Sequence, residues 1–172
     1  VLGMWVAGTL IVSVIASQNF YTVDVLLSEM TNTMFRDAAL RHGQQDARDM
    51  PRYLSSELNR LYFQLWNLMQ VVIGVVALRL VWPEPAARAA RWVVVAMLGT
   101  VILMALWLAP EITAVGRTLD FVPRDPPPSA LGRFGILHAA YATLEVMKGV
   151  AGVVVMVVVN RTVRMKADTT YV

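Results

Sequence analysis

Residues 134–159 read FGILHAAYATLEVMKGVAGVVVMVVV, an apolar run that contains three ionisable side chains, His138, Glu145 and Lys148. The run is longer than the roughly 20 residues that a helix needs to cross a bilayer. A charged side chain in hydrocarbon costs several kcal/mol, on the order of +2.5 to +3.5 on insertion scales. The run therefore predicts a membrane-spanning helix with a buried polar site, which is a candidate for function.

Three further apolar runs precede this one, so the chain has four candidate spans. They are Leu2–Leu27, Leu61–Trp82, Trp92–Ala109 and Phe134–Val159. Hydrophobic residues make up 57% and charged residues 16% of the 172 residues, a composition too apolar for an ordinary soluble domain. The sequence predicts an all-α fold: one integral membrane domain over residues 1–172, built as a four-helix bundle.

The first run is expected to be a true transmembrane helix. The alternative is a cleaved signal peptide, because Val14-Ile15-Ala16 resembles a small-residue cleavage site, but no basic segment precedes it. Tryptophans lie mostly near the ends of the runs, where we expect them to be interfacial anchors. These tryptophans are Trp5, Trp66, Trp82, Trp92 and Trp107.

Residues 28–60 are charged but keep a helical rhythm of apolar positions. Gly43 is a natural helix stop, and Asp49 before Pro51 is a suitable helix start. We therefore predict two long helices, about Leu2–Arg41 and Pro51–Trp82, that project beyond the bilayer as an antiparallel hairpin. The alternative is an amphipathic helix that lies flat on the membrane.

Basic residues distribute almost evenly between the two sides that four spans define. The side of the hairpin carries eight Lys and Arg residues and the side of the termini six, but the six lie closer to the span ends. We expect both termini to be cytoplasmic, in a bacterial inner membrane. The net charge of +3 suits contact with anionic lipid headgroups, and no basic stripe with interleaved aromatics indicates nucleic-acid binding.

Polar residues in the second and fourth spans match in depth. Counted from the terminal side, Lys148 and Gln70 each lie 12 residues inside, and Glu145 and Asn67 each lie 15 residues inside. At 1.5 Å per residue these depths are about 18 and 22 Å, which places Lys148 near the middle of the bilayer. The sequence thus predicts that Glu145 pairs with Lys148 and that the two amides solvate the pair.

Gly74 and Gly152 match in depth as well, each eight residues inside. On each helix the glycine continues the line of polar residues, which gives one stripe of Asn67, Gln70 and Gly74 and another of Glu145, Lys148 and Gly152. Because glycines allow two helices to approach closely, we predict that the second and fourth spans pack directly on these stripes. Two interpretations stay open for the polar residues of the stripes. They are either packing contacts that specify the fold, or a site for proton or ion movement or ligand binding.

Histidines are candidates for ligating a haem or a metal. His138 lies one heptad before Glu145, and His42 lies in the hairpin on the same side of the membrane. Their spacing matches no motif, so we expect satisfied or interfacial histidines, with shared ligation as the alternative. The chain has no cysteine, its methionines are scattered, and no phosphate loop, nucleophile elbow or zinc motif is present. We predict no catalytic residue, no metal site and no cofactor.

Two short motifs carry a family resemblance. The segment from Arg133 to Tyr141, RFGILHAAY, and the segment from Asp49 to Tyr53, DMPRY, resemble a bacterial family of four-helix membrane domains of unknown function. That family is distantly similar to copper-resistance-type integral membrane domains. The resemblance implies a four-helix bundle without an established chemistry, and it marks His138 as a position of interest.

Function is predicted at the level of class. We expect a small non-enzymatic membrane protein, an accessory or assembly subunit of a larger membrane complex, in contact with lipids and with other membrane subunits. The alternative is a haem- or metal-binding protein for electron transfer or ion handling that uses His138.

Overall fold

The chain is described by a computed structural model that covers residues 1–29 and 31–170, without the side chains of residues 42, 44, 86 and 161–170. All regular structure in this part of the chain is helical. The elements are α1 (Leu2–Glu29), α2 (Thr33–His42), α3 (Gln44–Val81), the short η1 (Pro85–Ala87), α4 (Arg88–Leu103), the π-helix η2 (Met104–Leu108), α5 (Ala109–Arg117) and α6 (Ala130–Thr170).

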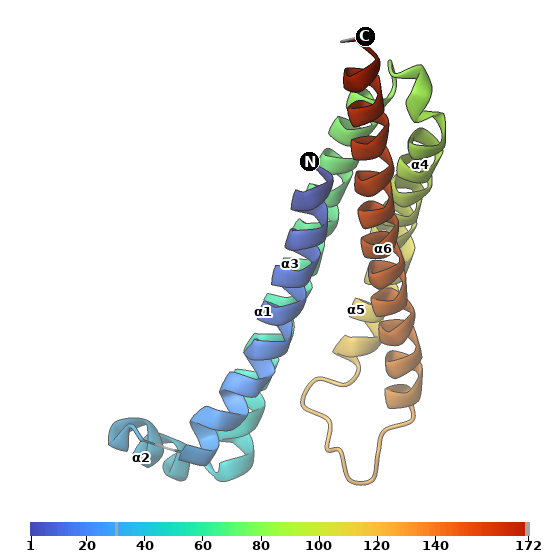
Figure 1. The fold of residues 1–172 in the computed structure, drawn as a ribbon. Coiled ribbons are helices and arrows are strands. Elements are labelled where there is room, and N and C mark those ends of the chain that lie inside the picture. Colours follow the sequence, from blue (N-terminus) through green and yellow to red (C-terminus); the bar gives the residue numbers. More distant parts are fainter. Residues whose placement is uncertain (30, 171–172) are drawn as a thin grey trace.

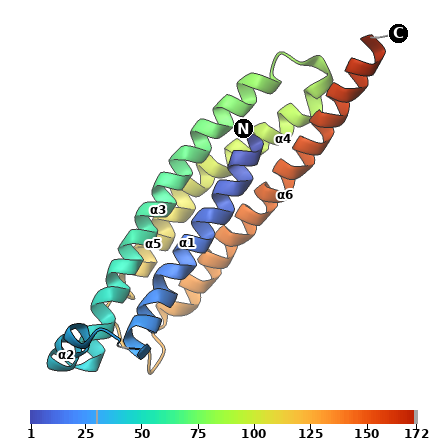
Figure 2. The same ribbon diagram turned by 60° about the vertical axis from the view of Figure 1, so that its left-hand side comes forward.

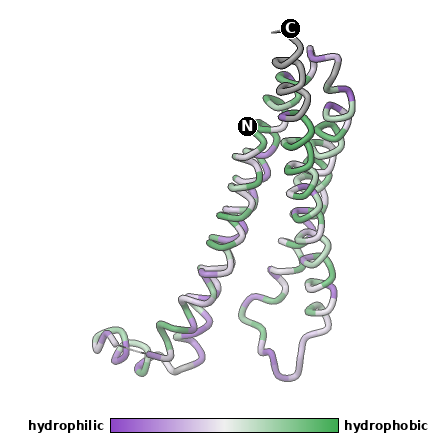
Figure 3. The backbone as a smooth tube through the Cα atoms, in the orientation of Figure 1, coloured by the Kyte–Doolittle hydropathy of each residue, from purple (hydrophilic) through white to green (hydrophobic). Residues whose placement is uncertain are grey.

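Four helical segments are long and apolar enough to cross a membrane, which confirms this part of the prediction. They are Leu2–Glu29, Gln45–Val81, Arg88–Arg117 and Ala130–Asn160. These segments run side by side, with Val1 and the last turns of α6 toward one end, here called the terminal end, and α2 at the other (Figure 1). Hydrophilic residues gather at this α2 end and in the loop after α5 (Figure 3).

The third span is longer than predicted. It continues through α4, η2 and α5 to Arg117 instead of ending at Ala109. Pro110 follows directly on the π-helical turn. A proline has no N–H to donate and its ring crowds the carbonyl one turn earlier, so a wider π turn before it keeps the helix continuous.

The first long helix is interrupted, contrary to the prediction of one helix over Leu2–Arg41. α1 ends at Glu29, and α2 is a separate helix that turns aside from the axis of α1 (Figure 1). The cause lies in Asn32, whose side chain accepts a hydrogen bond from the backbone N–H of Phe35 at 3.0 Å and caps α2. Gly43 ends α2 with a φ of 86°, as the sequence indicates.

α3 begins at Gln44 and not at Pro51. Pro51 therefore lies inside the helix, on a segment where most side chains are wholly or partly exposed. Its missing N–H removes one hydrogen bond of the helix, to the carbonyl four residues earlier. Asp49 is a helical residue here and does not cap a helix.

Packing between the long helices places α3 and α6 at opposite corners. α1 and α4 each pack against both α3 and α6, and α1 lies between α3 and α6 in Figure 2. A Cβ atom on Gly74 would contact Trp5 of α1 and Leu98 of α4, and one on Gly152 would contact Val6 of α1. The predicted direct glycine contact between the second and fourth spans is therefore wrong, because α1 occupies that position.

Two tryptophans pack reciprocally on glycines of the neighbouring helix. A Cβ on Gly8 of α1 would lie 2.1 Å from Cη2 of Trp66 of α3, and one on Gly74 of α3 would lie 3.2 Å from Cη2 of Trp5 of α1. A Cβ on Gly8 would overlap the Trp66 ring, and one on Gly74 would crowd the Trp5 ring. This exchange brings the α1 and α3 backbones together and explains why α1 carries a glycine in the middle of its apolar run.

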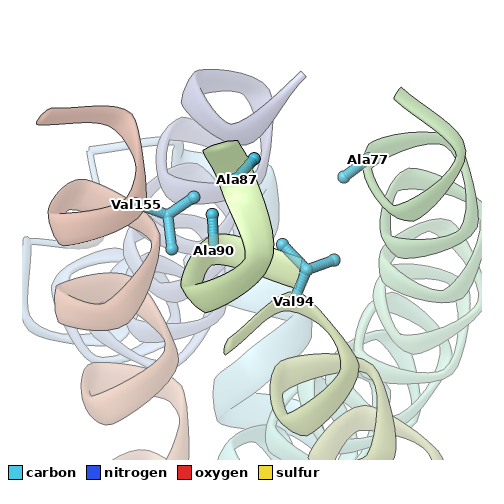
Figure 4. Close-up of a cluster of buried hydrophobic side chains, with 5 residues drawn as sticks. All are labelled: Ala77, Ala87, Ala90, Val94 and Val155. Carbon is cyan, nitrogen blue, oxygen red and sulfur yellow. The ribbon is translucent and has the colours of Figure 1, made fainter. Parts of the chain in front are cut away.

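Toward the terminal end the helices meet in an apolar layer of small side chains. Ala77 of α3, Ala87 of η1, Ala90 and Val94 of α4, and Val155 of α6 form one buried cluster (Figure 4). Val94 is fully buried. Small residues at such a contact let helix backbones approach closely without polar groups.

Candidate functional site

A buried ion pair lies on α6, one turn apart along the helix. Nζ of Lys148 donates a hydrogen bond to Oε1 of Glu145 at 2.9 Å and another to Oε1 of Gln70, on α3, at 2.7 Å. The three residues are 3%, 7% and 0% exposed, respectively. Both partners of the lysine are thus side chains of the same protein, and the ion pair is removed from the outer surface of the helices.

Gln70 is the centre of the hydrogen-bond network. Its Oε1 accepts from Lys148 and also from the indole Nε1 of Trp5 at 2.7 Å, while its Nε2 donates to Glu145 at 3.1 Å. The second carboxylate oxygen of Glu145 accepts from Oγ1 of Thr9 at 3.2 Å. We call these five residues the polar centre; they join α1, α3 and α6 across the diagonal of the helix arrangement.

Asn67 belongs to a second, adjacent contact one turn nearer the α2 end. Its Oδ1 accepts a hydrogen bond from the hydroxyl of Tyr141 at 2.9 Å, and both residues are buried. The Tyr141 ring packs edge-on against Phe63 with centroids 5.4 Å apart. Met104 and Leu108, of η2, enclose the ring in the same cluster.

The structure brings together three of the six residues predicted for the polar packing site. Glu145, Lys148 and Gln70 meet directly, whereas Asn67 pairs with Tyr141 one turn away. Gly74 and Gly152 face α1 and α4 instead of each other, as described above.

Three residues of these contacts were not predicted from the sequence as site residues: Trp5, Thr9 and Tyr141. Trp5 was expected at the membrane interface, but it is 2% exposed and its indole N–H is used by the polar centre. The signal available was helical spacing, since Thr9 lies four residues after Trp5 and Tyr141 four residues before Glu145. Spacing alone does not say which face of the first helix meets the others.

A cleft of about 1950 Å³ extends from the α2 end to the level of Asn67 and Tyr141. Its walls come from α3 on one side and from α5 and α6 on the other, with α2, the end of α1 and the loop after α5 around its mouth. Two contacts bridge the mouth: Arg60 binds both carboxylate oxygens of Asp120, at 2.9 and 3.1 Å, and the rings of Tyr53 and Phe121 lie 5.0 Å apart.

His138 lies on the wall of this cleft. It is exposed, and its ring stacks on Phe134 with centroids 5.7 Å apart. The side chain of the other candidate ligand, His42, lies outside the described part of the structure. Among the residues that are described, no group of three or more histidine, aspartate and glutamate side chains is placed to hold a metal ion.

The polar centre lies between the cleft and the apolar layer. On the α2 side, Asn67 and Tyr141 separate it from the cleft, and on the terminal side Val155 and Val94 belong to the apolar cluster. Every polar group of the centre described above is engaged with another side chain. Such an arrangement links helices and orients charges, since a buried carboxylate needs both a cation and hydrogen-bond donors.

Comparisons with known proteins give no match: no family model, no curated protein and no solved structure matches this chain.

Proposed function

We propose that this chain is an integral membrane protein that crosses the bilayer four times. Support comes from the four apolar helices and from the polar centre, where Glu145, Lys148 and Gln70 satisfy one another inside the helix arrangement. Side chains on the outer surface of the spans are largely aliphatic, for example Leu10, Leu106 and Val150. An apolar exterior around an internally paired polar site is what a lipid environment requires.

The part of the molecule beyond the bilayer is proposed to be the α2 end. The first turns of α3, the last turns of α1 and all of α2 form an antiparallel hairpin there, next to the loop at residues 118–129. Arg48 and Arg52 of α3 each approach Asp24 of α1 at 3.5 Å, which holds the two arms together. Both termini then lie on the other side, which we propose to be the cytoplasmic side of a bacterial inner membrane.

Within this class we propose a non-enzymatic accessory or assembly subunit of a larger membrane complex. The observation that carries this proposal is the engagement of the polar centre. Lys148 and Glu145 are used as a link between three helices, and their hydrogen-bonding groups are directed at one another rather than at a substrate. The hairpin offers an exposed surface for a partner, with charged residues and with the apolar side chain of Met34, which is 83% exposed.

Site-specific photo-crosslinking in native membranes tests the proposal. A photoreactive residue at Met34 should capture one larger membrane protein in stoichiometric yield, and the same complex should survive purification in a mild detergent. The matched control is Leu106, 77% exposed on the third span, which should capture lipid only. A chain that remains uncrosslinked at Met34 and purifies alone would overturn the accessory role.

A haem- or metal-binding role is the second candidate, and the position of His138 on the cleft wall is what favours it. The imidazole is exposed there and stacks on Phe134, so an external ligand has access to it. Visible absorption and metal analysis of the protein purified from membranes test this role. A stoichiometric Soret band or bound metal that disappears in His138→Ala would establish it, and a colourless, metal-free protein would exclude it.

A further inference from the structure

Charge divides the cleft into two parts. All nine charged residues that line it fall in residues 24–60 and 117–125, around the mouth. The inner part is lined by residues of 63–71, 105–116 and 131–141, and none of those lining residues is charged. The mouth is thus suited to water and headgroups, and the inner part to something without a charge.

The inner part of the cleft is mostly apolar but contains two exposed polar side chains. Phe63, Leu68 and Ile112 are among its aliphatic and aromatic walls. Gln64 and His138 are exposed in it, and within the described part of the chain neither side chain has a hydrogen-bond partner. An amide and an imidazole on opposite walls therefore offer donors inside an apolar space.

The depth and the size of the cleft restrict which ligands its inner part can bind. The inner part extends to the level of Asn67, which the residue count places about 22 Å from the terminal side and so inside a hydrocarbon core of about 30 Å, where a charged group costs several kcal/mol. The whole cleft, at about 1950 Å³, is larger than the roughly 300–1,000 Å³ of a drug-sized pocket. Leu68 of α3 lines the cleft and is 62% exposed, so it leaves an uncovered apolar wall there.

We propose that the inner part of the cleft binds an uncharged lipid whose polar end carries carbonyl or hydroxyl oxygens, the chemistry shared by membrane quinones and monoacylglycerols. The oxygen atoms accept hydrogen bonds from Gln64 and His138, and the apolar tail lies along the wall that contains Leu68. This proposal is independent of the accessory role, because it requires only this chain and the bilayer.

Binding is measured with two probes, decylubiquinone and 1-monooleoylglycerol, added to the purified protein in detergent micelles and followed by native mass spectrometry. We expect one molecule of at least one probe to bind saturably. The probe that binds identifies the source of the ligand as quinone or glyceride. Oleate, which has the same chain as the glyceride but a charged end, should not displace it.

Variants tie the binding to the cleft. Gln64→Leu and His138→Leu should each weaken binding about three- to tenfold, the loss expected for one hydrogen bond. The matched control is Gln18→Leu, the same exchange at an exposed residue that does not line the cleft, and it should bind as the wild type does. Ala109→Trp, which places a large ring at a residue that lines the inner part, should abolish binding.

Three results would overturn the proposal. They are non-saturable uptake of both probes, equal weakening by Gln64→Leu and Gln18→Leu, and displacement of the bound probe by oleate. Far-UV circular dichroism and gel filtration of each variant establish that it is folded, so that Gln64→Leu and Ala109→Trp give independent answers.

Discussion

Lys148→Met should destabilise the protein more than any surface substitution, because it breaks the polar centre and leaves its carboxylate uncompensated. The change removes the two hydrogen bonds of Nζ, at 2.7 and 2.9 Å. Glu145, 7% exposed, then keeps only neutral donors, from Thr9 and Gln70. Removal of one partner from a buried pair costs about 3–5 kcal/mol, which is the expected loss in the free energy of unfolding.

The double variant separates the charge effect from lost packing. Glu145→Gln combined with Lys148→Met leaves a neutral amide of similar size, whose oxygen can accept from Nε2 of Gln70 while its NH2 donates to the hydroxyl of Thr9. Replacing a buried ion pair by neutral groups is often close to neutral, so we expect the double variant to lose only about 1 kcal/mol. The double variant is then at least about 2 kcal/mol more stable than Lys148→Met, and the single variant Glu145→Gln completes the cycle that gives the coupling energy.

Reversible unfolding in mixed micelles, titrated with a denaturing detergent and followed by circular dichroism, measures these free energies. Arg88→Met is the matched control, since it removes an exposed cation and should change stability by no more than about 0.5 kcal/mol. A Lys148→Met variant within about 1 kcal/mol of the wild type, or a double variant as unstable as the single one, would show that the ion pair does not stabilise the fold in this way.

Three further predictions use local features. Gly8→Ala should cost at least about 2 kcal/mol because its Cβ would lie 2.1 Å from an indole carbon, whereas Gly149→Ala, with nothing within 4 Å, should gain up to about 1 kcal/mol in the same titration. Asn32→Ala should destabilise α2 by roughly 1 kcal/mol, seen as faster hydrogen exchange confined to that helix; a change in global stability would contradict it. Arg60→Met, which loses a partly buried carboxylate pair, should cost about 1.5–3 kcal/mol, and Arg117→Met, 63% exposed, no more than about 0.5; equal losses would argue against the pair.

The sequence predicted the long helices well because length and apolarity are local properties. Breaks in the helices were harder to predict. The cap at Asn32 could have been predicted, since asparagine is a preferred N-cap residue, but the helical rhythm of apolar positions around it favours one continuous helix. The sequence predicts a helix start at Pro51, whereas α3 starts directly after Gly43, which has a positive φ.

The polar centre was predictable in depth but not in direction. Counting residues from the span ends places Lys148 level with Gln70, and the structure joins them by a hydrogen bond. The same count placed Asn67 beside Glu145, yet Asn67 turns to Tyr141. Residue counts fix position along a helix axis, but the neighbouring helix is set by packing, here by Trp5 and Trp66 on glycines of the opposite helix.

The position of the polar centre explains why an ion pair is used at this point of the fold. Toward the terminal end, small residues such as Ala90 pack the helices closely, and toward the α2 end α3 separates from α5 and α6 around the cleft. An apolar contact is non-directional and would let α6 shift along its axis at that boundary. Lys148 and Glu145 also bind Gln70 of α3 and Thr9 of α1, so a shift of α6 by one residue would keep the ion pair but break these hydrogen bonds to the other two helices. The ion pair thus fixes the height at which the cleft begins, whatever occupies it.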